Sequence, residues 1–340
     1  MTPSADARSG TAARIARFPF PFGSDTYRYA TNVEPARRRV ATAAGAWGGP
    51  VIDVDDDYRA ELAERRRVLA RDPGRCVVLP HMRPAAWDAL LFVLRELAAG
   101  HPGVMELRDD GAGRLRWRNA LLGVDQAFTV GDDGSLLGGP LRFAGSQAQE
   151  DLVLLDQRED ALWADAGLVT FAANWSLAFD IGMSFAEVHG PVPRLHAAGV
   201  VDRAQRFLLR LAPGQEYRRT NWGMTVDRRL DTSAETYPHW GRDRRTVAEG
   251  PAAELGDRLH LRVEVQHLVR LAPSGAVLFL IRTYLLSLAD LATVPEWRRR
   301  FAAVLASLPD DLVDYKGLVR FRDAAVRWLH AAGPPSGAVT

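Results

Sequence analysis

Two long runs of alternating residues, joined by a short turn, constrain the fold of this chain more than any other feature. The segment RLHLRVEVQHLVRLAPSGAVLFLIRTYLLSL occupies residues 258–288. Apolar and polar residues alternate on both sides of Pro273-Ser274-Gly275, as in two strands joined by a hairpin turn. A third alternating run, EYRRTNWGMTVDRRL at 216–230, precedes them. We therefore expect three long antiparallel strands at the centre of the molecule.

The remaining periodic segments predict helices near both ends of the chain and strands between them. Amphipathic helices are indicated at 51–75 and 83–103, and again near the C-terminus. Shorter apolar or β-branched runs between them indicate strands, at 113–123, 126–131, 150–157 and 162–175. This order of elements is typical of an α+β fold, in which helices pack on one face of an antiparallel sheet.

Composition excludes several classes of protein. The 340 residues include 43 basic and 42 acidic side chains, a balance that calls for neither nucleic acid nor an anionic membrane surface as a partner. The longest apolar run, AVLFLI at 276–281, is too short to span a bilayer. The single cysteine, Cys76, excludes an intrachain disulfide and any cluster held by several thiolates. Lys316 is the only lysine, which codon bias in a GC-rich genome explains. We expect a cytoplasmic protein.

The segment ANWSLAFDIGMSFAEVHGPVP, residues 173–193, ends a helical pattern with a histidine. Gly190 suits the left-handed position just after a helix, and Pro191 prevents the helix from continuing. His189 is then the last helical residue, where the helix dipole favours a cation. Alternatively, its neutral imidazole could project into a cavity under the sheet and ligate haem iron. The sequence leaves both interpretations open.

Six segments, in this order, resemble the haem-dependent oxidative N-demethylase family. The similarity covers about residues 18–330 and is carried by DDDYRAELAERRRVL (55–69), QEDLVLL (149–155), LVTFAANW (168–175), GMSFAEVHGPVP (182–193), RRTNW (218–222) and RVEVQHLVRLAPSGAVLFLIRTYL (262–285). The resemblance implies a haem b inside a PAS-like domain, with His189 as the iron ligand. Asp180 stands where the family pattern has a lysine, and this reversed charge argues against dimethylamine itself as the substrate.

The resemblance also implies a reaction and its partners. Members of this family activate O2 at the haem and hydroxylate the carbon next to the nitrogen of a small amine. Their electrons come from a separate flavin and iron–sulfur reductase, and some members form hetero-oligomers. This chain has no GxGxxG motif after a strand, no CxxC pair and no Walker loop, so an electron donor outside the chain is required.

The resemblance and the periodicity together suggest five regions. We expect a disordered N-terminus (1–15), a helical subregion (16–105), a PAS-like core with helices enclosing the haem (106–290), C-terminal helices (291–332) and a disordered tail (333–340).

Several side chains are candidates for the site around His189. Arg219, Asn221 and Trp222 form a dense polar and aromatic cluster on the 216–230 strand, where arginine could pair with haem propionates and Trp222 could line an amine pocket. Trp175 is a further candidate for contact with the cofactor. Each of these also has a purely structural interpretation, such as a salt bridge or a packed indole.

The hairpin contributes two further candidates. Glu264 shares a strand face with Gln266, and if that face points inward its carboxylate could hold an ammonium group or relay protons to bound O2. Arg282 could serve the same pocket. A simple ion pair between Glu264 and Arg282 across the hairpin is the alternative.

The most plausible activity is a haem-dependent monooxygenase acting at C–N bonds. One alternative is a haem-based PAS gas sensor, although the sequence shows no output domain after the core. Another is a tailoring oxygenase that acts on a larger amine or an amino acid. A third is a scaffold whose haem site has decayed, against which the intact His189-Gly190-Pro191-Val192-Pro193 element argues.

Overall fold

A seven-stranded antiparallel sheet forms the centre of the protein. A computed structural model describes residues 5–28 and 31–332. Within them the strand order is β1-β10-β11-β12-β8-β9-β4, and every neighbouring pair is antiparallel. The α+β class expected from the sequence is confirmed. The strands of this sheet are β1 (Glu34–Pro35), β4 (Cys76–Val78), β8 (Asp151–Arg158), β9 (Ala161–Leu168), β10 (Tyr217–Val226), β11 (Leu259–Arg270) and β12 (Val277–Ser287).

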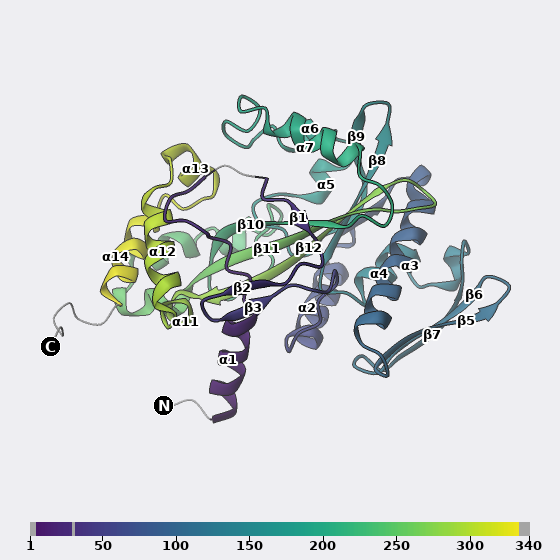
Figure 1. Ribbon diagram of the computed structural model, residues 1–340, viewed down its shortest axis with the longest axis horizontal. Helices are drawn as coiled ribbons and strands as arrows, with labels where there is room; N and C mark the ends of the chain where they lie inside the picture. The colour runs from purple at the N-terminus through teal and green to yellow at the C-terminus, as the bar shows by residue number, and fades with distance from the viewer. Residues whose placement is uncertain (1–4, 29–30, 333–340) are drawn as a thin grey trace.

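Two small sheets and a set of helices complete the described structure (Figure 1). The small sheets contain β2 (Val40–Thr42) with β3 (Gly45–Trp47), and β5 (Met105–Gly111) with β6 (Arg114–Asn119) and β7 (Val124–Thr129). The α-helices are α1 (Ala5–Arg17), α2 (Tyr58–Arg71), α3 (Arg83–Gly100), α4 (Gly139–Gly145), α5 (Leu177–Asp180), α6 (Phe185–Val188), α7 (Val200–Leu209), α8 (Tyr237–Trp240), α9 (Asp243–Glu249), α10 (Leu255–Arg258), α11 (Leu288–Ala292), α12 (Pro295–Ala306), α13 (Asp310–Tyr315) and α14 (Arg322–Ala331).

Helices cover both faces of the central sheet. Helices α5 to α7 lie on one side, and their apolar side chains pack on Val153, Leu268 and Val277 (Figure 1). The opposite face is covered by α2 to α4 near β8 and by α11 to α14 near β10. The sequence prediction placed the helices on one face only. That prediction is wrong because the connection between β9 and β10 contains its own short helices.

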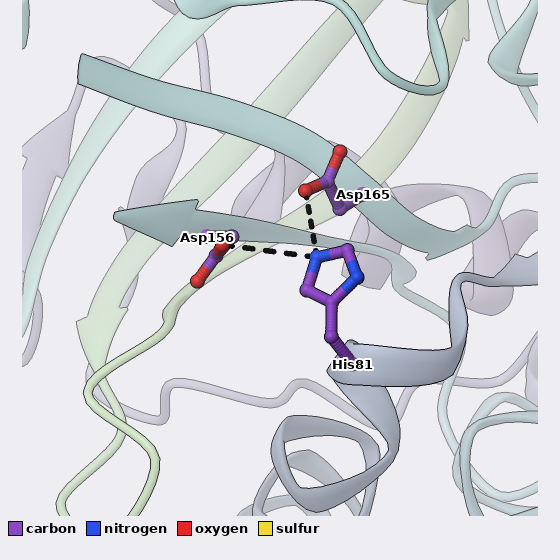
Figure 2. Close-up of side chains that lie close together, drawn as sticks. All are labelled: His81, Asp156 and Asp165. Carbon is purple, nitrogen blue, oxygen red and sulfur yellow. Dashed lines mark hydrogen bonds and ion pairs between the residues drawn. The ribbon is translucent and has the colours of Figure 1, made fainter. Parts of the chain in front are cut away.

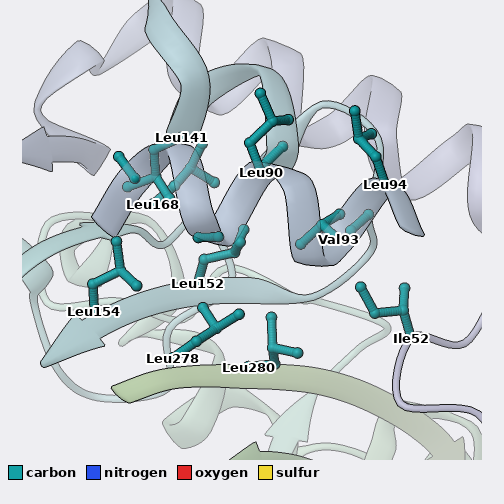
Figure 3. Close-up of a cluster of buried hydrophobic side chains, with 14 of the residues drawn as sticks. Ile52, Leu90, Val93, Leu94, Leu141, Leu152, Leu154, Leu168, Leu278 and Leu280 are labelled. Atoms are coloured by element: carbon teal, nitrogen blue, oxygen red, sulfur yellow. The ribbon is translucent and has the colours of Figure 1, made fainter. Parts of the chain in front are cut away.

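The larger core lies between the sheet and helices α3 and α4. Leu152, Leu278 and Leu280 project from adjacent strands towards Leu90 and Val93 of α3 (Figure 3). Each of these five side chains is fully buried. Burial of a leucine or valine side chain contributes about 1.5–3 kcal/mol, so this layer holds α3 firmly against the strands.

The N-terminal region differs from the prediction in two ways. Residues 5–15, expected to be disordered, belong to α1, whose sequence contains the strong helix former alanine at five positions and whose Ile15 packs against the apolar core under β10. Region 16–105 contains α2 and α3 but is not purely helical, because β1 and β4 join the two edges of the central sheet. Strands of two or three residues are too short to show a periodic pattern. The predicted disordered tail, 333–340, lies outside the described residues.

The region expected to be the core, 106–290, also differs in part. Strands β5 to β7 form a separate sheet beside α3, whereas β8 to β12 belong to the central sheet. The 258–288 hairpin is confirmed, with His260 paired to Ser287 at one end and Arg270 paired to Val277 at the other.

The helix expected over 173–189 is wrong. Two four-residue helices, α5 and α6, replace it, because Gly182 adopts a left-handed backbone (φ +85°) that ends the first helix before the second begins. Gly190 does not have the left-handed conformation predicted for it; its N–H donates to the Glu187 carbonyl at 2.9 Å.

None of the helices in the described part of the chain is both long and apolar enough to cross a membrane.

Candidate functional site

The short helix α6 positions His189 over one face of the central sheet. Ser184 begins the helix with a capping box: its hydroxyl accepts from the Glu187 N–H, and its own N–H donates to the Glu187 carboxylate at 2.8 Å. Phe185 and Val188 of the same helix pack into the apolar cluster on the sheet. His189 follows as the C-terminal cap, so its place depends on four residues of helix and their packing.

The His189 ring has the hydrogen bonding of a neutral metal ligand. Nδ1 donates to the Phe185 carbonyl at 2.8 Å, and the ring lies 4.3 Å from the Phe185 ring. Nε2 makes no hydrogen bond to the described part of the chain. Burial lowers the pKa of His189, and the positive charge of Arg219 lowers it further. A histidine fixed through Nδ1 by a backbone carbonyl presents a neutral Nε2 to a metal, as ligating histidines usually do.

The strand register places the polar candidates on the same side of the sheet as His189. Arg219 pairs with Gln266 and Asn221 pairs with Glu264, and residues paired across antiparallel strands point to one face. Leu268, which lies on that same face of β11, packs in the apolar cluster that includes residues of α6. Four predicted site residues, His189, Arg219, Asn221 and Glu264, therefore share this face.

Glu264 is a buried carboxylate held by three neighbours. Its Oε1 accepts from Arg262 Nε at 3.2 Å, and its Oε2 accepts from Asn221 at 3.3 Å and from Gln266 at 3.0 Å. Its exposure is 6%. The condition on which its predicted role depended, a buried carboxylate, is therefore met, and the role itself stays a prediction. The predicted ion pair with Arg282 is wrong, because Arg262, two residues along the same strand, provides the partner charge.

Arg219 lies at the outer side of the same cluster. Its Nη1 donates to Gln266 Oε1 at 2.8 Å and its Nε donates to the Thr31 carbonyl at 3.2 Å. Burial lowers its pKa, and the nearby Glu264 carboxylate acts in the opposite direction. Among the described residues Arg219 forms no ion pair, so its charge is available to an anionic ligand.

Trp175 lies close to this group. It precedes α5 and packs against the same apolar cluster on the sheet as Phe185 and Val188 do. Its contact with the cofactor stays a prediction.

Trp222 is not part of this face. It lies one residue from Asn221 in β10, so its side chain points to the opposite side of the sheet. There its ring packs edge-on against Phe22 and Phe301, with centroids 5.0 and 5.9 Å away. The prediction that Trp222 and Glu264 line one pocket is wrong for this reason.

Arg282 is likewise a residue of the opposite face. Glu264 pairs with Thr283 across the hairpin, so Arg282 points away from Glu264. Its guanidinium binds Asp55 at 2.6 Å and Glu61 at 2.8 Å, and it is 2% exposed. Arg282 therefore points away from Glu264, and both carboxylates that it binds belong to the N-terminal region. For this reason the structure does not support a catalytic role for Arg282.

A cleft with several charged side chains in its lining opens beside Arg282. Aspartates 53, 55 and 57 and Glu61 line it, and arginines from α1 and from the loop after β10 pair with them. Those carboxylates already have cationic partners, so we interpret the lining of the cleft as an ion-pair network. The cleft does not lie on the sheet face that carries His189.

One further cluster has metal-ligating side chains. Figure 2 shows His81 Nε2 directed at Asp165, 2.9 Å away, and at Asp156, 3.7 Å away. Asp165 is the extra residue of a β-bulge in β9, which re-aims its side chain. Arg158 binds both carboxylates, at 2.5 and 3.4 Å. The guanidinium supplies the positive charge that a metal would bring, so we interpret this cluster as an ion-pair network.

The sequence-based search missed Lys316 and Arg262 as neighbours of the site. Lys316 follows α13 and donates to the Trp222 carbonyl at 2.7 Å. Its only signal in the sequence is that no other lysine exists in the chain. Arg262 lies two residues before Glu264 in β11, so the alternation along this strand is the signal that could have found it.

A comparison with protein families finds a match over most of the chain. The family described as haem-dependent oxidative N-demethylase, alpha subunit-like, matches residues 45–326. The match includes α6, His189 and the strands that carry Arg219 and Glu264.

Proposed function

Because the chain belongs to the haem-dependent oxidative N-demethylase, alpha subunit-like family, we propose that it is a haem-dependent monooxygenase. It hydroxylates a carbon next to an amine nitrogen, using O2 and electrons from a separate reductase. The observation that carries this proposal is His189, whose Nδ1 is held by the Phe185 carbonyl and whose Nε2 bonds to none of the described residues. It lies over a sheet face that holds the buried Glu264 carboxylate and the Arg219 guanidinium, which forms no ion pair within the described part of the chain.

The residues on this face fit a haem b group. His189 would hold the haem iron through Nε2, with its tautomer fixed by the Phe185 carbonyl. Arg219, which has no carboxylate partner in the described part of the chain, would pair with a propionate, as guanidinium groups do well. Asn221 and Trp175 would complete the contacts to the cofactor. We further propose that strands β8 to β12, with α5 to α7 inserted between β9 and β10, form the PAS-like core.

Glu264 is suited to bind the amine substrate. Its Oε1 accepts one hydrogen bond and its Oε2 accepts two, so Oε1 retains a lone pair for an N–H donor. Its three neighbours hold the carboxylate in one orientation. It would therefore place the nitrogen of the substrate, and with it the adjacent carbon, without needing to reorganise.

The chemistry requires few proton transfers from the protein. Bound haem supplies the activation of O2 and the oxidation of the C–H bond. The amine, O2, two electrons and two protons give a carbinolamine and water, and the carbinolamine then breaks its C–N bond to yield an aldehyde and a shortened amine. His189 stays neutral throughout, and Glu264 holds the substrate nitrogen.

An absorption spectrum tests the proposal. Wild-type protein expressed with ample haem should show a Soret band, and His189→Ala should lose or shift it. His196→Ala is the matched control, because His196 is exposed and close enough to lower the pKa of His189, and it should retain the wild-type spectrum. A wild-type protein that does not bind added haemin would overturn the proposal. With haem bound, aldehyde release from secondary and tertiary amines in the presence of a reductase would identify the substrate class.

A further inference from the structure

The only lysine of the chain lies at the edge of the proposed site. Every other basic residue, apart from histidine, is an arginine. Lys316 Nζ donates to the Trp222 carbonyl at 2.7 Å and lies 4.6 Å from the centre of the Trp222 ring. Among the described residues, β1 pairs with β10 only at Tyr217 and Arg218. Lys316 contacts β10 further along, on the strand that also carries Arg219.

The charges around Lys316 do not balance. The Glu264 carboxylate acts to raise the pKa of Lys316, but Glu264 is already ion-paired with Arg262. Arg219 acts in the opposite direction, and burial lowers the pKa of Lys316 to about 8. In the part of the chain that the structure describes, neither Arg219 nor Lys316 has a carboxylate within ion-pair distance. Two partly buried cations with no counterion are costly unless an anion joins them.

We propose that Lys316 and Arg219 together bind a carboxylate of the ligand that His189 faces. This inference rests on the proposed function, and the carboxylate is then a haem propionate. A compact ammonium group suits this position, because it can contact the Trp222 carbonyl and a carboxylate oxygen at once, whereas a planar guanidinium needs more space.

The single lysine makes the first test direct. Protein grown on lysine labelled with ¹³C at Cε gives one side-chain signal, whose shift against pH reports the pKa of Lys316. Zinc protoporphyrin IX is a diamagnetic ligand that keeps both propionates, and binding it should raise that pKa by about one unit or more. The dimethyl ester of the same porphyrin should bind without the rise. An unchanged pKa with the free acid, or an equal rise with the ester, overturns the inference.

Haem dissociation provides the second test. Transfer of haem to apomyoglobin should be about tenfold faster from Lys316→Met than from wild type, the effect expected for one charge-assisted contact. Arg320→Met removes an exposed charge four residues away and should not change the rate. Haem dimethyl ester should leave both the wild type and Lys316→Met at the same rate. Equal rates for haem itself would contradict the role of Lys316.

The two proposals fail in different ways. If haemin gives no Soret band with the wild type, the proposed function fails. If haemin binds and His189→Ala removes the band, but the Lys316 signal does not respond, only the carboxylate-binding role of Lys316 fails.

Discussion

Replacing Arg282 separates the structural network from the proposed site. Arg282 is 2% exposed and binds Asp55 and Glu61, and Glu61 is itself 3% exposed. Arg282→Met leaves two carboxylates without their cation in a poorly solvated place. Removing one partner of a buried ion pair costs about 3–5 kcal/mol, a large share of the roughly 5–15 kcal/mol that stabilises a typical protein.

The loss of folding stability caused by Arg282→Met should grow as the pH rises. Burial already raises the pKa of Glu61 with Arg282 present, and losing the arginine raises it further. A carboxyl whose pKa is higher in the folded state than in the unfolded state stabilises the fold while protonated, and this contribution is lost as pH rises through the folded pKa. Arg282→Met should therefore be closer to wild type at pH 5 than at pH 8.

Urea unfolding of the haem-free protein at these two pH values measures the effect. Arg228→Met is the matched control: Arg228 also contacts Glu61, at 3.6 Å, but is 39% exposed, so its loss should cost less than about 1 kcal/mol. Adding Glu61→Gln to Arg282→Met should recover part of the lost stability. The reasoning is refuted if Arg282→Met retains wild-type stability while its Soret band is lost, since Arg282 would then act in the haem site.

Three further outcomes follow from single side chains. Burial raises the pKa of Glu150 from 4.5 to about 7, so Glu150→Gln should stabilise the protein by up to about 3 kcal/mol at pH 8 and by little at pH 5, as urea midpoints at the two pH values will show. Ser184→Ala removes the capping box of α6 and should cost about 1 kcal/mol in thermal unfolding, with faster haem loss through His189; an unchanged haem loss rate would mean that α6 does not position His189. Burial raises the pKa of the Cys76 thiol to about 11, so its alkylation by iodoacetamide at pH 8 should be more than about a hundredfold slower in the folded protein than in urea, and equal rates would contradict its burial.

The central hairpin shows what local pattern alone determines. Residues 259–287 alternate over two long runs, and Pro273-Ser274-Gly275 between them has the composition of a turn, so both strands and their antiparallel pairing could be predicted. Local chemistry also predicts the main helices, since a stripe of apolar residues at helical spacing needs no information from elsewhere in the chain. The proposed role of His189 also came from short-range sequence, through the resemblance of its segment to a known family.

Only the tertiary structure decided which side chains share a face. Asn221 faces Glu264 because β10 and β11 pair in one register, and a shift of a single residue would have placed Trp222 there instead. No turn links these two strands directly, so the chain between them does not specify the register. The partners of Arg282 and the position of Lys316 depend on contacts between segments more than 90 residues apart, Lys316 to Trp222 at 94 and Arg282 to Glu61 at 221. Local propensity carries no record of such contacts, because they form only when the packed core brings those segments together.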